Sequence, residues 1–151
     1  MTDINIISVR ENPEYLERAV DYLSSKWGIS REVYHESVSD GIHTKNSLPR
    51  WYLLLKDGVI IGSYGLIEND FISRVDLKPW LCALYVEEAH RGENLGAYLL
   101  DHGVCESALL GYRRVYLCTD HVGYYEKCGW HYIGNGYSAS GAETRIYEFI
   151  S

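Results

Sequence analysis

Apolar residues alternate with polar ones in some segments of the chain and recur every three or four positions in others. Residues 4–9 show the short apolar pattern of a first strand. A helix is expected next, because an N-cap and a proline precede an apolar series at helical spacing: Asn12, Pro13, Leu16, Ala19, Val20, Leu23 and Trp27. Gly28 is expected to end it. Ser30 begins a second predicted helix, which we expect to end at Gly41.

A β-hairpin is predicted in the middle of the chain. Residues 51–56 and 59–67 are rich in strand-forming residues and are separated by Asp57-Gly58, a dipeptide suited to a type I′ turn. Residues 80–86 are almost continuously apolar, which is typical of a strand covered on both faces.

The second half of the chain predicts a helix, a strand, a short helix and two strands. These are residues 95–110, 115–118, 124–127, 131–137 and 144–150. A strand, helix and strand in succession require a parallel crossover, whereas tight turns join antiparallel neighbours. We therefore predict an α/β fold with a mixed, mostly antiparallel sheet flanked by helices, in the order β-α-α-β-β-β-α-β-α-β-β. Because no linker or internal repeat is visible, residues 1–151 are expected to form a single domain.

Charge and composition exclude several classes of function. The chain carries 14 Lys and Arg against 21 Asp and Glu, a net charge of −7. Without a basic cluster, a nucleic-acid-binding protein is not expected. No apolar run reaches the roughly 18 residues of a membrane span, and the first ten residues do not read as a targeting peptide. The four cysteines contain no Cys-x-x-Cys pair, which favours thiols in a reducing cytoplasm.

The segment from Leu84 to Leu100 carries the clearest chemical signal. A buried strand leads through a glycine-containing turn into a helix. At such a junction, unpaired backbone N–H groups and the helix dipole favour a phosphate or pyrophosphate. Glycine allows the anion to approach the backbone closely.

This segment resembles the cofactor motif of the GNAT-superfamily N-acetyltransferases, Arg/Gln-x-x-Gly-x-Gly/Ala. The match is Arg91-Gly92-Glu93-Asn94-Leu95-Gly96, with Asn94 where the first motif glycine is usual. Asparagine tolerates a positive φ, and we expect Glu93 to point to solvent. A second signature, Tyr124-Tyr125-Glu126-Lys127-Cys128-Gly129-Trp130, resembles the family's Tyr-Glu-Lys-x-Gly-aromatic pattern. The predicted order of elements is also that of the family.

The resemblance implies acetyl-CoA as co-substrate and an amine of a small molecule or peptide as acceptor. The cofactor would contact Leu84, Tyr85, Val86, Arg91, Gly92, Glu93, Asn94, Leu95, Gly96, Ala97 and Tyr125. Tyr125 would protonate the departing sulfur, since a phenol is not ionised at neutral pH. One tyrosine of the adjacent pair is expected in the core and the other in the cleft, and the resemblance to the family motif assigns Tyr125 to the cleft.

Several residues are candidates for the general base. Glu68, Asp70, Asp76, Asp120 and His121 all lie in segments expected near the ends of the central strands. His121 has the most suitable intrinsic pKa and lies four residues before Tyr125, so it is our candidate from the sequence.

The acceptor site is predicted from aromatic and charged residues. Trp80 and Tyr34 are candidates for surrounding an ammonium group, and Arg74 would suit an acceptor carrying a carboxylate. The sequence does not decide between these two acceptor types. A homodimer is implied only by the resemblance.

Two alternatives are compatible with the residues. Cys118-Thr119-Asp120-His121 and Cys128-Gly129-Trp130-His131 form two Cys-x-x-His pairs, a spacing that also occurs in zinc sites. We favour no metal, because Cys118 ends a predicted buried strand. The second alternative is a non-catalytic CoA-binding sensor or interaction module of the same fold, for which Asn94 is the main argument.

Overall fold

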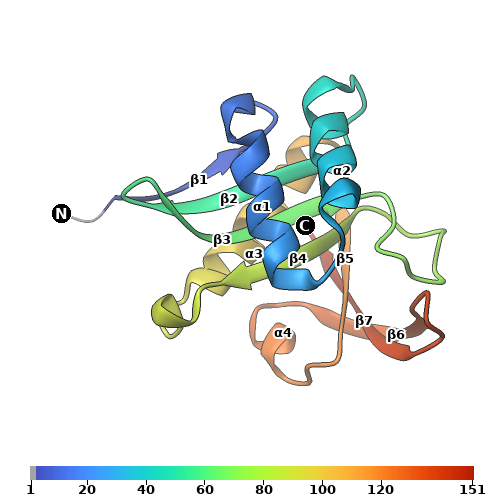
Figure 1. The fold of residues 1–151 in the computed structure, drawn as a ribbon. Coiled ribbons are helices and arrows are strands. Elements are labelled where there is room, and N and C mark those ends of the chain that lie inside the picture. Colours follow the sequence, from blue (N-terminus) through green and yellow to red (C-terminus); the bar gives the residue numbers. More distant parts are fainter. Residues whose placement is uncertain (1–2) are drawn as a thin grey trace. The chain divides into compact units, whose positions relative to one another are not determined.

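The computed structural model describes residues 3–151 (Figure 1). Its helices are α1 (Leu16–Trp27), α2 (Arg31–His43), α3 (Leu95–Leu109) and α4 (Tyr124–Lys127), with 3₁₀ turns at Pro13–Tyr15 and Glu88–His90. Its strands are β1 (Ile4–Ser8), β2 (Arg50–Lys56), β3 (Val59–Ile67), β4 (Trp80–Val86), β5 (Arg114–Thr119), β6 (His131–Tyr137) and β7 (Glu143–Ile150). The predicted order of elements is confirmed.

The strands form a sheet in the order β1-β2-β3-β4-β5-β7-β6. β4 and β5 pair in parallel, as the predicted crossover through α3 requires. The β1–β2, β5–β7 and β6–β7 pairs are antiparallel. The mixed, mostly antiparallel sheet is therefore confirmed.

The residues group into two compact units, which we describe separately. The first contains the described residues up to Gly65 together with Ala83–Leu99, and the second contains Leu66–Cys82 and Leu100–Ser151. The chain crosses between the units within β3, β4 and α3.

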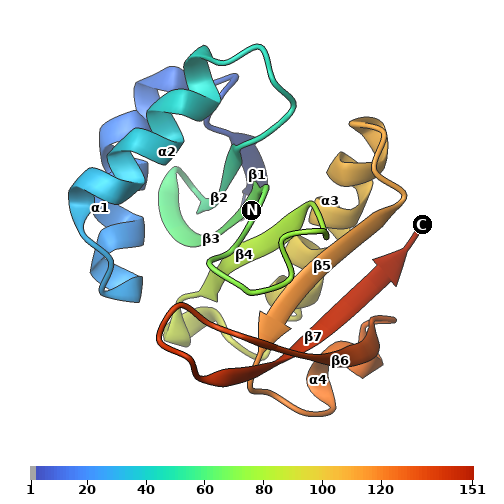
Figure 2. The ribbon, with the colours of Figure 1, turned by 90° about the vertical axis from the view of Figure 1, so that its right-hand side faces the viewer.

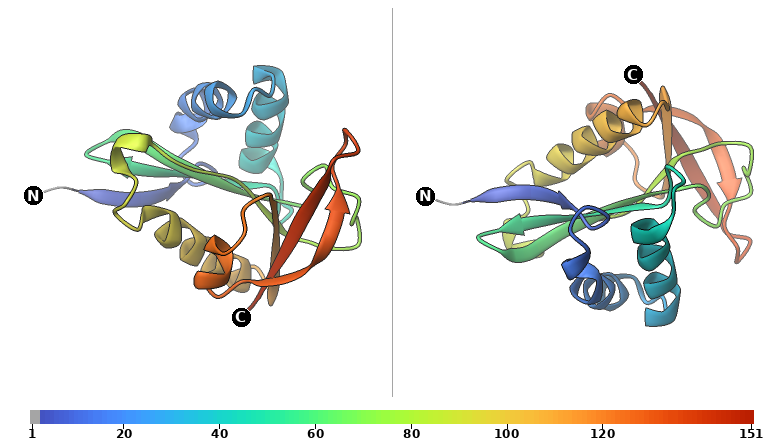
Figure 3. Two further views of the ribbon diagram at one scale, coloured as in Figure 1. Left: turned by 90° about the horizontal axis from the view of Figure 1, so that it is seen from below. Right: turned by 90° about the horizontal axis from the view of Figure 1, so that it is seen from above.

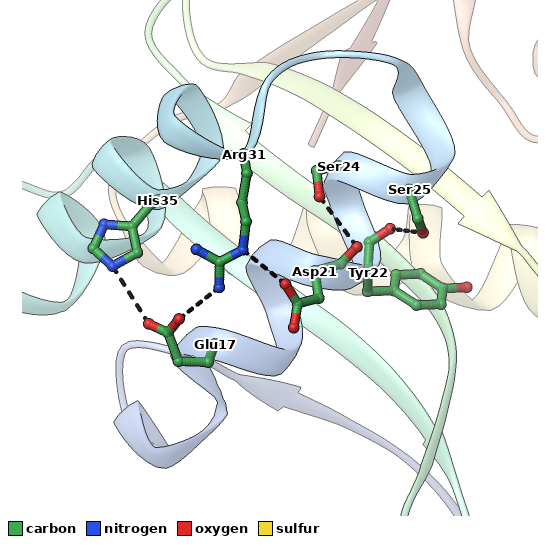
Figure 4. Close-up of polar contacts among 7 residues, drawn as sticks. All are labelled: Glu17, Asp21, Tyr22, Ser24, Ser25, Arg31 and His35. Atoms are coloured by element: carbon green, nitrogen blue, oxygen red, sulfur yellow. Dashed lines mark hydrogen bonds and ion pairs between the residues drawn. The ribbon is translucent and has the colours of Figure 1, made fainter.

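In the first unit, α1 and α2 lie side by side over one face of β1, β2 and β3 (Figure 3). Arg31, at the start of α2, forms ion pairs with two residues of α1, Asp21 at 2.8 Å and Glu17 (Figure 4). Val20 and Leu23 of α1 are buried, together with other apolar side chains of this unit. Burial of these apolar faces, more than the exposed ion pairs, stabilises this unit.

Glycine positions confirm two sequence predictions and correct a third. Gly28 caps α1 with φ 66°, and Asp57 and Gly58 both have positive φ, as the type I′ turn requires. Gly41, however, does not end α2, which continues to His43. A Cβ atom at Gly41 would lie 2.9 Å from the carbonyl oxygen of Pro49, so this glycine allows close packing inside the helix.

Two helix predictions also differ in detail. The Asn12 side chain donates to the carbonyl of Ser8 at 2.9 Å instead of capping a helix, and a 3₁₀ turn precedes α1. Apolar residues on two faces of the segment 95–108 predict a helix that lies deep in the domain. Leu99 and Leu100 are buried, but Tyr98 and Leu109 are exposed, because α3 has apolar residues on its solvent side as well.

In the second unit, β5, β7 and β6 lie next to one another (Figure 2). An apolar cluster of Ile72, Trp80, Tyr116 and Ile146 is formed around them. The loop before β4 is fixed to the end of β6 by a β-bridge between Ile72 and Ser138 and by a 2.9 Å bond from the Ser73 amide to the Tyr137 carbonyl. The loop between β3 and β4 is therefore anchored to the sheet.

Candidate active site

In the first unit, the end of β4 carries the predicted cofactor contacts. Ala83 has φ 51°, a left-handed conformation that interrupts the regular strand. The Ser63 hydroxyl donates to the Ala83 carbonyl at 2.9 Å and holds this kink in place. Leu84, Tyr85 and Val86 follow it and are partly exposed. Their backbone is the part of β4 predicted to contact the cofactor.

The turn after β4 has the geometry of an anion site. Gly92 has φ 87° and Asn94 has φ 64°, so the asparagine adopts the left-handed conformation expected of the motif glycine. The first bond of α3 runs from the Tyr98 amide to the Asn94 carbonyl at 3.1 Å. The amides of Leu95, Gly96 and Ala97 therefore belong to the first helical turn, where helix geometry provides no intrahelical partner. Free amides at the start of a helix are the groups to which a phosphate typically binds.

Two charged side chains of the turn contact neighbouring groups of the same segment. Arg91 donates from Nε to the Val86 carbonyl at 3.0 Å, and its guanidinium lies 5.4 Å from the centre of the Tyr85 ring. The Glu93 carboxylate lies 3.4 Å from Nδ1 of His90. Glu93 is exposed, as predicted. It pairs with His90 and not with Arg91, so an ion pair between Glu93 and Arg91 does not cover the exposed backbone of the turn.

In the second unit, Tyr125 is the predicted proton donor. Tyr125 lies on α4 with its side chain buried, and the centre of its ring is 5.7 Å from the centre of the Tyr147 ring. Burial, followed by the influence of Tyr124 and Cys128, raises the pKa of Tyr125 to about 12, against a hydrogen bond from Thr119 that lowers it. Tyr125 therefore keeps its proton at neutral pH. Tyr124 is exposed, so one tyrosine of the pair is buried and the other is open, but the buried one is Tyr125, which the family motif had assigned to the cleft.

A network that the sequence did not indicate holds α4 against β7. The Tyr147 hydroxyl donates to Oε2 of Glu126 at 3.0 Å and accepts from Nε of Arg145 at 3.0 Å. Oε1 of Glu126 accepts from the Gly123 amide at 2.9 Å, at the start of α4. Arg145 and Tyr147 are separated from Glu126 by about twenty residues, so only the pairing of the final strands brings them together.

The candidate bases differ in their surroundings. His121 is exposed, and its backbone N–H donates to Oγ1 of Thr119 at 3.1 Å. Asp70 is half-buried, and Sγ of Cys118 donates to its Oδ2 at 3.6 Å. Burial raises the pKa of Asp70 to about 6, although the bond from Cys118 opposes the shift.

The zinc alternative gains no support from the structure. Within residues 3–151, no group of three or more His, Cys, Asp or Glu side chains is placed to hold a metal ion, and the cysteines form no disulfide. Burial and the neighbouring Asp70 raise the pKa of Cys118 to about 12. A thiolate ligand is therefore disfavoured at this position.

The three predicted acceptor residues lie in different environments. Arg74 is exposed and pairs with both carboxylate oxygens of Asp76 at 2.9 Å. Trp80 is fully buried in the second unit, and its Nε1 donates to the Leu77 carbonyl at 2.7 Å. Tyr34 is buried in the first unit with its ring 5.8 Å from that of Trp51. Only Arg74 is open to an acceptor, because the two aromatic side chains serve packing.

In the part of the chain that the structure describes, no helix combines the length and apolar character needed to cross a bilayer.

Comparison with known proteins agrees with this geometry. Residues 13–130 match the model of the acetyltransferase (GNAT) family. No protein of curated function matches the chain.

Solved structures share the fold at low sequence identity. An aminoglycoside 6′-acetyltransferase type Ii is 21% identical, with a TM-score of 0.70 over 98% of this chain and 96% of its own. An aminoglycoside 6′-N-acetyltransferase in complex with coenzyme A is 18% identical, with a TM-score of 0.71 over 98% and 96% of the two chains. A GNAT acetyltransferase from Elizabethkingia anophelis with acetyl-CoA bound is 15% identical, with a TM-score of 0.65 over 98% of each chain.

Proposed function

The chain belongs to the GNAT acetyltransferase family, and from this premise we propose that it is an acetyl-CoA-dependent N-acetyltransferase acting on a primary amine. The amine attacks the thioester directly and belongs to a small molecule or a peptide. The observation that carries the proposal is the turn after β4. Gly92 and Asn94 have positive φ values and lead directly into α3, whose first amides have no intrahelical partner and can bind a pyrophosphate.

The residues divide the work of acetyl transfer between them. The turn from Arg91 to Ala97 binds the pyrophosphate, and the backbone of Leu84, Tyr85 and Val86 binds the pantetheine arm. A backbone N–H of that strand stabilises the oxyanion of the tetrahedral intermediate. Tyr125 gives its proton to the sulfur as the C–S bond breaks, which its protonated state at neutral pH supports.

The acceptor is most consistent with a cationic amine. The net charge of −7 attracts such a molecule. Arg74, the residue that would favour a carboxylate-bearing acceptor, is already paired with Asp76. Amino sugars belong in the screen, since two structural neighbours are aminoglycoside acetyltransferases.

Calorimetric titration with acetyl-CoA tests the proposal first, with ATP as the control anion and an amine panel to follow. We expect acetyl-CoA binding at micromolar concentration, no comparable binding of ATP, and thiol release that depends on an added amine. Binding without transfer to any amine would favour the non-catalytic CoA-binding module. Absence of binding would contradict both readings.

Glu93→Gln is expected to tighten acetyl-CoA binding by about two- to fivefold, because it removes a carboxylate beside the bound pyrophosphate. The gain should shrink as salt rises, since exposed charges are screened. Glu88→Gln is the matched control, because Glu88 is also exposed but precedes the turn. Titrations at two salt concentrations measure the effect, and equal affinities for the two variants would place the pyrophosphate elsewhere.

A further inference from the structure

We propose that Asp70 is the general base of the reaction and takes a proton from the acceptor ammonium on the face of the sheet opposite to Tyr125. This inference rests on the proposed function. It replaces His121 with a residue from the loop between β3 and β4.

The register of β5 and β7 places the two groups on opposite faces. Cys118 lies opposite Ile146, and Leu117 lies opposite Tyr147. Since successive residues of a strand point to opposite faces, Cys118 and Ile146 share one face while Leu117 and Tyr147 share the other. Asp70 contacts Cys118, whereas the ring of Tyr125 packs on Tyr147. Both groups thus lie beside the carboxyl-terminal end of β5, but from different sides.

This division suits acetyl transfer. The attacking nitrogen and the departing sulfur are different substituents of the same carbonyl carbon, and each needs its own proton-transfer group. A base on one face and an acid on the other can serve them at the same time. The environments also separate the two groups chemically, since burial raises the pKa of the Asp70 carboxyl to about 6 and that of the Tyr125 phenol to about 12.

The loop holds Asp70 in one position. The side-chain amide of Asn69 accepts from the Ile72 amide and donates to the Ile72 carbonyl, both at 3.1 Å. Ile72 is itself buried in the apolar cluster of the second unit. Asp70 lies between Asn69 and Ile72, in the turn that these two hydrogen bonds close. Its hydrogen-bond partner Cys118 packs against the same apolar cluster. A carboxyl group held against apolar side chains costs stability, which the hydrogen bond from Cys118 offsets only in part.

The other candidates lack this placement. β4 itself, Trp-Leu-Cys-Ala-Leu-Tyr-Val, offers no carboxylate or imidazole. Glu68, Asp120 and His121 are exposed, and Asp76 is paired with Arg74. Among the described residues, the titratable group facing Asp70 is Cys118 on β5. The charge of Asp120 in turn contributes to the raised pKa of Cys118.

The proton and electron movements balance. The Asp70 carboxylate takes one proton from the ammonium and later releases it to water. The nitrogen lone pair then forms the C–N bond at the thioester carbon, and the C–S electron pair leaves with the sulfur, which takes the proton of Tyr125. The second proton of the nitrogen returns through water to the Tyr125 phenolate. The products are the amide and the CoA thiol, with one proton released to solvent.

The pH profile of kcat/KM for Asp70→Asn tests the assignment, measured with two amines of different basicity. In the wild type we expect a rising limb near pH 6 that is the same for both amines. Asp70→Asn should remove this limb and lower kcat/KM by about 10²- to 10³-fold, with acetyl-CoA affinity unchanged. Asp101→Asn, an exposed carboxylate of α3 in the same unit, is the matched control and should keep the wild-type profile.

A second variant separates proton transfer from a structural role. Cys118→Ala removes the hydrogen bond that lowers the pKa of Asp70, so the rising limb should move to higher pH while the maximal rate changes little. A purely structural Asp70 would leave the position of the limb unaltered in this variant.

Three outcomes would overturn the assignment. Wild-type rates and profile in Asp70→Asn, with the wild type active on amines, would remove Asp70 and leave the proposed function standing. Loss of the limb in His121→Gln, with the limb intact in Asp70→Asn, would assign the base to His121. Failure of the wild type to acetylate any amine would overturn the proposed function, and the base assignment with it.

Discussion

Tyr125→Phe should lower kcat for acetyl transfer by about 10²- to 10³-fold, because the sulfur then leaves without a positioned proton donor. The ring contacts with Tyr147 and Tyr124 do not need the hydroxyl, so the fold and acetyl-CoA affinity should be retained. Thiol release with a saturating amine gives kcat, and calorimetry gives the affinity. The loss should be smallest for an acyl donor whose thiol leaving group is more acidic than CoA.

Tyr124→Phe is the matched control for this variant. The adjacent tyrosine lies on the same short helix, but its side chain is exposed and hydrogen-bonded to Cys128. We expect near wild-type turnover from it. Full activity in Tyr125→Phe, or equal losses in the two variants, would remove Tyr125 from the role of acid.

Trp80→Ala should lower the free energy of unfolding by about 3–5 kcal/mol, since it leaves a cavity in place of a fully buried indole. It also removes the 2.7 Å bond to the Leu77 carbonyl and the ring contact with Tyr116. For a chain of this size the melting temperature should fall by about 10 °C. Urea and thermal unfolding measure both quantities.

Arg74→Ala is the comparison on the same loop. Its ion pair with Asp76 is exposed, so the free energy of unfolding should change by less than about 1 kcal/mol. If Trp80→Ala left stability unchanged and altered only the choice of acceptor, Trp80 would be a substrate residue, as its sequence context predicted, and not a residue of the core.

Local signals in the sequence were sufficient for the order of the elements. Gly28 and the Asp57-Gly58 turn depend on backbone preferences of the residues themselves, so their positions could be predicted without knowledge of distant contacts. Apolar periodicity likewise predicted the strands and helices that follow them. Gly41 shows the limit, because its close approach to Pro49 depends on tertiary packing and resembles a helix end in the sequence.

The conformation of the proposed cofactor turn was also predictable, because all its residues are contiguous. The left-handed conformation of Asn94 follows from the preference of one residue type, and the open amides follow from where the helix begins. The acceptor residues were less predictable. An aromatic residue that binds a cation at the surface and one that fills the core cannot be told apart in the sequence. Only their burial in the structure shows that Trp80 and Tyr34 belong to the core and not to a binding surface.

Proton transfer depended most on the tertiary structure. His121 was favoured because its ordinary pKa suits the task, which is a property of the free side chain. The properties of Asp70 come from burial and from Cys118, a residue far away in sequence, and the network around Glu126 depends on the register of β7. The chain's local preferences thus determined its elements and the conformation of the turn between β4 and α3. The protonation states of its buried groups were decided only by folding, because pKa values respond to surroundings that distant segments supply.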